Sequence, residues 1–218
     1  MPKSKLVGAF FQMDTVRGNR YLDDAGQIMN QYEAILPQMD VGIEGLRMRG
    51  GDGPIREMRV STRQIWISFQ DPDSLQLAID HALPVVQSIC EIIHVTAAKR
   101  FGLRTEFLAS PPDMKELISP LANDLFSSSL IETQDKISTF ETMLGFQWDD
   151  LHGNVRVRPV QEVRGGTVRE NFGLMFDIDV YQEGADLQVN KLNTFLRSAH
   201  GTIKERTSLL EKKVQVNT

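Results

Sequence analysis

The sequence has little cysteine: Cys90 is the only one among 218 residues. A single thiol cannot form an intramolecular disulfide, and without a cysteine pair the common thiolate zinc sites are excluded. Cysteine-poor chains are typical of reducing compartments, so we expect a cytoplasmic protein. Because Cys90 falls on the apolar side of a helical pattern, we interpret it as a small buried side chain rather than a nucleophile.

The sequence also has no long hydrophobic run. The apolar stretch 6–11 follows a basic start, but it is too short for the core of a signal peptide or for a membrane span. We therefore expect neither export nor a membrane partner. With 41% hydrophobic and 24% charged residues, the chain has the profile of a soluble globular protein that can bury a core without disulfides or metals.

Basic charge is not in excess. The 24 Lys and Arg residues are outnumbered by 29 Asp and Glu residues, which gives a formal net charge of -5. Proteins whose whole surface follows nucleic acid or anionic lipid usually carry a basic excess. The composition therefore argues against nucleic acid as a partner, although a local basic patch is compatible with it.

The signature motifs of several large enzyme classes are missing. The sequence contains no P-loop, no GxGxxG after a strand and no GxSxG elbow. The glycines at 50–53 belong to a predicted hairpin, so they lack the helix N-terminus that a phosphate loop uses. No zinc-ligand spacing relates the four histidines, which are His81, His94, His152 and His200. We expect no cofactor and no metal, and the sequence favours a non-enzymatic protein.

Hydrophobic periodicity predicts a similar order of elements in the two halves of the chain. A strand at 5–13 and a helix at 20–36 open the first half, and a strand at 99–108 and a helix at 112–126 open the second. Apolar runs at 65–69 and 174–180 predict later strands, each preceded by a Gly-Gly turn. Long helices are predicted to begin at 71–74, with a kink near Pro84, and at 184–186.

These patterns predict an α+β fold made of two pseudo-repeated βαβββα units, residues 1–98 and 99–218, within one compact two-lobed domain. Both halves contain Arg-Gly-Gly, followed by Ile55-Arg56-Glu57 in the first and Val168-Arg169-Glu170 in the second. Mainly antiparallel curved sheets would pack on the long helices. This order is similar to the saddle of the TATA-binding-protein fold and to helix-grip proteins. A chance match of short tripeptides is the open alternative.

The strand at 99–108 also resembles a known family. Its Gly102-Leu103-Arg104 motif, with the strand at 65–69 and the closing helix around 196–203, is similar to an uncharacterised family of bacterial proteins of about this size. That family has an aromatic residue after the arginine, where this sequence has Thr105. The resemblance implies no activity, no cofactor and no catalytic residue.

Arginines at alternating positions are the most suggestive functional feature. Because side chains alternate across a strand, three strands would each carry two arginines on one face: Arg47 and Arg49, Arg100 and Arg104, and Arg156 and Arg158. Guanidinium groups suit phosphate and carboxylate, so we predict a sheet face that binds an anionic small molecule or an acidic protein partner. The alternative is a solvated face on which the arginines pair with nearby carboxylates, namely Glu57, Glu106, Asp177 and Asp179.

Two other functions stay open at this point. Asp177 and Asp179 would lie about 7 Å apart on one strand, and with His152 beside Asp149 and Asp150 they suggest a metal-assisted hydrolase. A curved sheet suggests nucleic-acid binding. The leading prediction is a non-enzymatic binding or assembly module that acts as a homodimer, because closed two-fold assemblies are the commonest oligomers.

Overall fold

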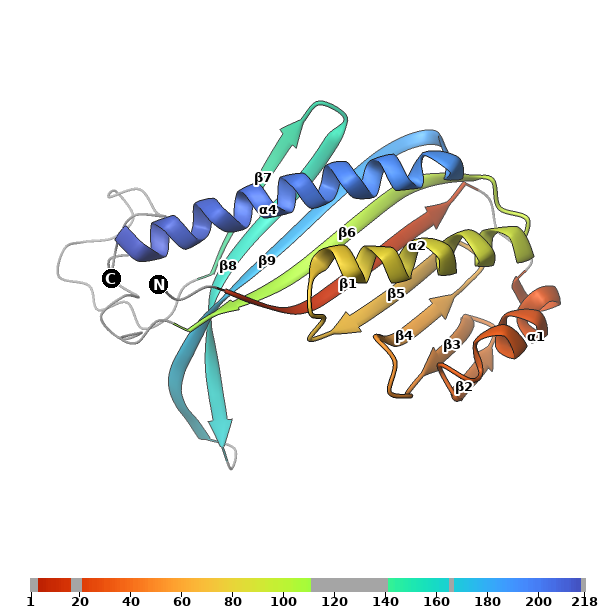
Figure 1. Ribbon diagram of the computed structural model, residues 1–218, viewed down its shortest axis with the longest axis horizontal. Coiled ribbons are helices and arrows are strands. Elements are labelled where there is room, and N and C mark those ends of the chain that lie inside the picture. The colour runs from red at the N-terminus through yellow and green to blue at the C-terminus, as the bar shows by residue number, and fades with distance from the viewer. Residues whose placement is uncertain (1–3, 17–20, 111–140, 165–166, 217–218) are drawn as a thin grey trace.

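The computed structural model describes residues 4–16, 21–110, 141–164 and 167–216. Within these ranges nine strands form a single antiparallel sheet in the order β2-β3-β4-β5-β1-β6-β9-β8-β7, with helices α1, α2 and α4 beside it (Figure 1). The predicted α+β class and antiparallel sheet are confirmed. None of the described helices has both the length and the apolar character needed to cross a bilayer.

The first half of the chain contains one strand more than its sequence predicts. Its elements are β1 (Lys5–Thr15), α1 (Tyr21–Tyr32), β2 (Gln38–Gly42), β3 (Gly45–Arg49), β4 (Ile55–Val60), β5 (Gln64–Gln70) and α2 (Leu75–Ile92). The strand β2 was not predicted, because four of its five residues are exposed and it shows little apolar alternation. The predicted helix 20–36 ends at Tyr32, before Pro37.

The second half differs from its prediction at the last helix. Its elements are β6 (Ala97–Ala109), β7 (Thr142–Trp148), β8 (Leu151–Arg164), β9 (Thr167–Gln188), the short 3-10 turn η1 (Val189–Lys191) and α4 (Leu192–Val216). The predicted helix start at 184–186 is wrong, because β9 continues to Gln188, which pairs with Ala97 of β6. The predicted helix 112–126 lies outside the described residues.

The two predicted halves share one continuous sheet. Strand β1 lies at its centre and pairs with β5 on one side and β6 on the other, so that Phe10 is opposite both Ser68 and Arg104. The strand with Arg47 and Arg49 is three places from β1, whereas the strand with Arg156 and Arg158 is two places from β6. These positions are not equivalent, and the pseudo-repeat and the saddle stay predictions.

Helices α2 and α4 lie across the same face of the sheet (Figure 1). The N-terminus of α2 is capped as its sequence predicts: the hydroxyl of Ser74 accepts a hydrogen bond of 3.1 Å from the backbone N–H of Leu77. Pro84 lies inside α2, which continues to Ile92. Between the helices and the sheet lies the core, which includes Phe11, Ile67, Phe101, Phe176, Ile89, Leu196 and Ile203. Burial of this face sets the register of the sheet and turns the alternate side chains to the opposite face.

Candidate functional site on the open face of the sheet

The face of the sheet opposite α2 and α4, here called the open face, carries one row of paired side chains that reaches all nine strands. Directly paired residues of an antiparallel ladder point to the same side. From β2 to β7 the row consists of Asp40, Arg47, Arg59, Trp66, Gln12, Gly102, Tyr181, His152 and Gln147. Most members of this row are polar or charged, whereas the helix-covered face is apolar.

The six predicted arginines all belong to the open face. The pairs lie on β3, β6 and β8. Each arginine either belongs to the nine-residue row or is an even number of residues away from the row's member on the same strand, so it points to the same side. Their surroundings differ, however, because some guanidinium groups are bound by carboxylates and others are not. The carboxylate contacts therefore differ from one arginine to the next.

The two arginines of β6 are occupied by carboxylates of β9. Arg104 donates through Nε and Nη2 to the two oxygens of Asp177, each at 2.8 Å, and through Nη2 to Glu106 at 3.0 Å. Arg100 donates through Nη2 to Oδ2 of Asp179 at 3.0 Å. Burial acts to lower the pKa of Arg104, but the hydrogen bond and charge of Asp177 outweigh it and raise this pKa. On β6 and β9, therefore, the arginines pair with carboxylates, which is the alternative to a ligand-binding face that the sequence left open.

Two of the residues considered for hydrolysis, Asp177 and Asp179, belong to these same ion pairs. Asp177 and Asp179 each accept hydrogen bonds from an arginine, and burial raises the pKa of Asp179 more than its ion pair with Arg100 lowers it. His152 lies on β8, and its ring stacks on Tyr181 with the ring centres 5.6 Å apart. Across the described residues, no three His, Cys, Asp or Glu side chains are placed to hold a metal ion.

At the β3–β4 end of the face, Glu57 joins two arginines. Arg47 donates to both oxygens of Glu57, at 2.7 and 2.8 Å, and Arg59 donates to Oε1 of the same carboxylate. Burial acts to raise the pKa of Glu57, but hydrogen bonds and charge from Arg47 and Arg59 outweigh it and leave this pKa below its ordinary value. Glu57 therefore remains ionised and fixes the position of Arg47.

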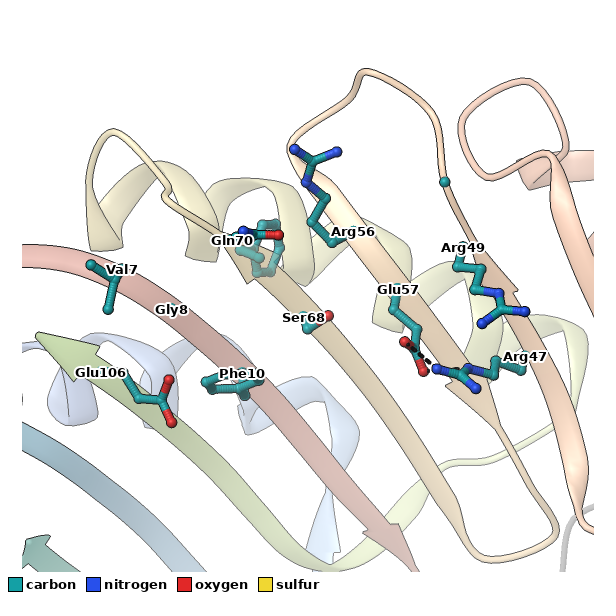
Figure 2. A pocket seen from close by; sticks show the side chains of 12 residues that line it. Val7, Gly8, Phe10, Arg47, Arg49, Arg56, Glu57, Ser68, Gln70 and Glu106 are labelled. Carbon is teal, nitrogen blue, oxygen red and sulfur yellow. Dashed lines mark hydrogen bonds and ion pairs between the residues drawn. The ribbon is translucent and has the colours of Figure 1, made fainter. Parts of the chain in front are cut away.

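Two further arginines at this end make longer hydrogen bonds and, among the described residues, only one each. Arg49 reaches Asp40 with an Nη2–Oδ2 distance of 3.5 Å, and Arg56 donates to the carbonyl of Gly51 at 3.3 Å. Each guanidinium has five N–H donors, so most of the donors of Arg49 and Arg56 are unused within the described part of the chain. Both side chains extend from the β3–β4 hairpin in Figure 2.

Arg56 is a residue that strand alternation fails to place. Ile55 is opposite Phe69 and Glu57 is opposite Ser68, so the pairing of β4 with β5 contains a bulge at residue 56. A bulge sets two residues against one and breaks the alternation of side chains. Arg56 consequently lies on the open face together with Glu57, whereas strict alternation would place it on the helix-covered face.

A hollow of about 730 Å³ connects these groups. One end is lined by Arg47, Arg49, Arg56 and Glu57, so that three guanidinium groups face one carboxylate there, and the other end is lined by Phe10 and Glu106 (Figure 2). Ser68 and Gln70 of β5 lie between the two ends, and Gly8 lies beside Phe10 and Glu106. The hollow is therefore cationic at the hairpin end, where the donors of Arg49 and Arg56 are available to an anion.

Aromatic side chains continue the surface from the hollow toward β6. The guanidinium of Arg59 lies 4.8 Å from the Trp66 ring centre, Trp66 stacks on Phe10 at 6.0 Å, and Arg104 lies 5.5 Å from the Phe10 ring. Trp66 itself is half-buried on the open face. Gln64 and Ser68 are polar and lie two residues before and after Trp66, so their positions could have placed Trp66 on the open face from the sequence alone.

No family model matches the chain, and no curated protein matches it. The similarity of Gly102-Leu103-Arg104 to an uncharacterised bacterial family thus remains a resemblance of a short motif.

Proposed function

We propose that the protein is a non-enzymatic binding module, and that the hollow beside Arg47, Arg49 and Arg56 holds an anionic group of a small ligand or of an acidic partner. The observation that carries this proposal is the unequal pairing of charge at the hairpin end of the hollow. Glu57 is used by Arg47 and Arg59, which leaves Arg49 and Arg56 to bind an incoming anion. Phosphate and carboxylate oxygens suit these donors.

The proposal divides the predicted arginines into two groups. Arg100 and Arg104 stabilise the sheet through Asp179 and Asp177, and Arg47 is held by Glu57. Arg49 provides the binding function, together with Arg56, which was not predicted. Arg156 lies 3.4 Å from Glu141, so the β8 end of the face is also partly compensated. The proposed ligand site is therefore the β3–β4 end of the open face and not the whole face.

Charge compensation over the rest of the face argues against nucleic acid as the ligand. A nucleic-acid site neutralises phosphates along a track of unpaired basic side chains, and its affinity depends on their number. Here the central arginines are already bound by Asp177, Asp179 and Glu57. We propose that the module acts in the cytoplasm on a compact anionic group.

Isothermal titration of the purified protein at low ionic strength tests the proposal, with inorganic phosphate and a hexaglutamate peptide as two separate probes. The variant Arg49→Ala/Arg56→Ala should lose binding by about 10-fold or more, because hydrogen bonds to charged groups contribute about 1.5–3 kcal/mol each. Phosphate binding alone favours a small anion, and peptide binding alone favours an acidic partner.

The matched control is Arg197→Ala/Lys212→Ala, which removes the same charge from exposed positions of α4. This variant should bind as the wild type does. Equal loss in both variants would show that only net charge matters, and absence of binding by the wild type to either probe would contradict the proposal.

A further inference from the structure

Strand β7 (Thr142–Trp148) forms an edge of the sheet without the features that usually protect an edge. It is last in the strand order and, among the described elements, pairs with β8 alone. Its sequence, TMLGFQW, contains no charged residue and no proline. Natural edge strands are commonly shielded by charge, proline, bulges or short length, since their free N–H and C=O groups can recruit another strand.

The opposite edge gives an internal comparison. Strand β2 has five residues and carries the charged Asp40, which lies near Arg49. Strand β7 has seven residues, pairs with β8 along its whole length without a register shift, and is neutral throughout. This difference is expected if the β2 edge faces solvent and the β7 edge is covered by another strand.

Hydrophobic side chains flank the free edge of β7. Met143, Leu144 and Trp148 are 60%, 58% and 48% exposed, although they are large and apolar. Met143 points to the open face with its ladder partner Arg156, while Leu144 and Trp148 point to the other side. Apolar surface thus lies on both sides of the edge backbone, which suits an added strand rather than a single docked side chain.

We infer that β7 pairs with β7 of a second copy of this chain, antiparallel and about a two-fold axis at Gly145. In that register Gly145 faces its own copy, Met143 faces Gln147, Leu144 faces Phe146 and Thr142 faces Trp148. Every residue of the strand then has a partner, and no like charges oppose each other within β7. A neutral strand that is centred on glycine is complementary to itself, as a two-fold interface requires.

The pairing would join two nine-stranded sheets. A two-fold axis through adjacent antiparallel strands runs perpendicular to the sheet, so both open faces lie on the same side of the dimer. The two hollows beside Arg49 and Arg56 then belong to one continuous surface, with one on each outer half. This inference does not depend on anion binding and can fail or succeed separately from it.

A cysteine at the proposed axis gives a direct test. Gly145→Cys is sterically acceptable, because a Cβ there would have Asn154 as its nearest neighbour at 3.6 Å. Cα atoms of facing residues in an antiparallel pair lie about 4.5–5.5 Å apart, within disulfide range. Mild oxidation should therefore convert Gly145→Cys into a covalent dimer, while the buried Cys90 leaves the wild type unlinked.

The matched control is Gln147→Cys, on the same strand and the same face. In the proposed register two copies of residue 147 are offset by four residues, or about 13 Å, which is too far for a disulfide. If Gln147→Cys links as fast as Gly145→Cys, the pairing about Gly145 is wrong.

Light scattering supplies an independent measurement. The wild type should show twice the 24.6 kDa chain mass, and Met143→Lys/Leu144→Lys should return it to the monomer value. Ile43→Lys, at an exposed hydrophobic residue elsewhere, should remain dimeric. A monomeric wild type, or a dimer that persists in the β7 lysine variant, would overturn the inference.

Discussion

Arg104 on β6 and Asp177 on β9 face each other across the open face, with two guanidinium nitrogens each 2.8 Å from a carboxylate oxygen. The Asp177 side chain is only 12% exposed, whereas that of Arg104 is 47% exposed. Asp177 therefore depends on Arg104 for charge compensation in a place that water reaches poorly. This relationship shows that some of the conspicuous arginines stabilise the sheet.

Replacement of Arg104 should weaken the fold. We expect Arg104→Ala to lower the free energy of unfolding by about 1 kcal/mol, a modest value because Arg104 is half exposed and its pair is screened by solvent. The free energy of unfolding of Arg104→Lys should lie between those of the wild type and Arg104→Ala, since an ammonium group keeps the charge but cannot make the paired contact with Asp177. Urea denaturation measures the difference. Arg158→Ala, at an exposed position of the same face, is the control and should match the wild type.

Glu57 should make stability depend on pH in the acid range. Its pKa lies below the ordinary 4.5, because Arg47 and Arg59 favour the ionised form. A carboxyl whose folded pKa is lowered contributes stability above the unfolded pKa and loses it as the pH falls through the folded pKa. The stability difference between wild type and Glu57→Gln should thus be largest at neutral pH and shrink below about pH 4.5. A difference independent of pH would contradict this explanation.

Gly153 should not tolerate a side chain. A Cβ there would lie 2.2 Å from the Phe146 ring and 2.7 Å from the carbonyl oxygen of Asp179. We expect Gly153→Ala to lower the free energy of unfolding by about 1–3 kcal/mol, the usual cost of forced repacking. Gly145→Ala on the neighbouring strand has no such contact and should have a small effect. Thermal unfolding of the two variants checks the comparison.

Cys90 should be unreactive in the native protein. Its side chain is buried in α2, and burial raises the pKa of the thiol to about 12. The thiolate is the reactive form, so a disulfide reagent near neutral pH should label the folded protein slowly. Labelling should become fast in denaturant, and its rate in the native state should follow the unfolding rate. Rapid stoichiometric labelling without denaturant would be inconsistent with this environment.

Nucleic acid should bind poorly. The central arginines of the open face already contact Asp177, Asp179 and Glu57, and the chain has a net charge of -5. Phosphate contacts are strongest at low salt, so a heparin column run at low ionic strength is a demanding test. We expect the protein to pass through it. Retention that is lost steeply with added salt would restore the nucleic-acid alternative.

Local sequence patterns predicted many elements because they depend on neighbouring residues. The alternation in Ile65–Phe69 gives a half-buried strand, and Ser74 begins α2 by capping it. Patterns of this kind also placed Arg47 and Arg49 on one face. They failed at β2, where few apolar residues mark the strand, and at the start of α4, where pairing of β9 with β6 extends the strand to Gln188.

The sequence by itself determined the α+β class, the helix-covered and open sides of most strands, and the presence of alternating arginines, because periodicity and capping are local. Tertiary structure alone decided which arginines contact carboxylates. Pairing of β6 with β9 brings Arg104 to Asp177, 73 residues away, and occupies it. The bulge in β4 places Arg56 on the open face, where it lines the same hollow as Arg49, because a bulge arises from the fit between two strands rather than from either strand alone.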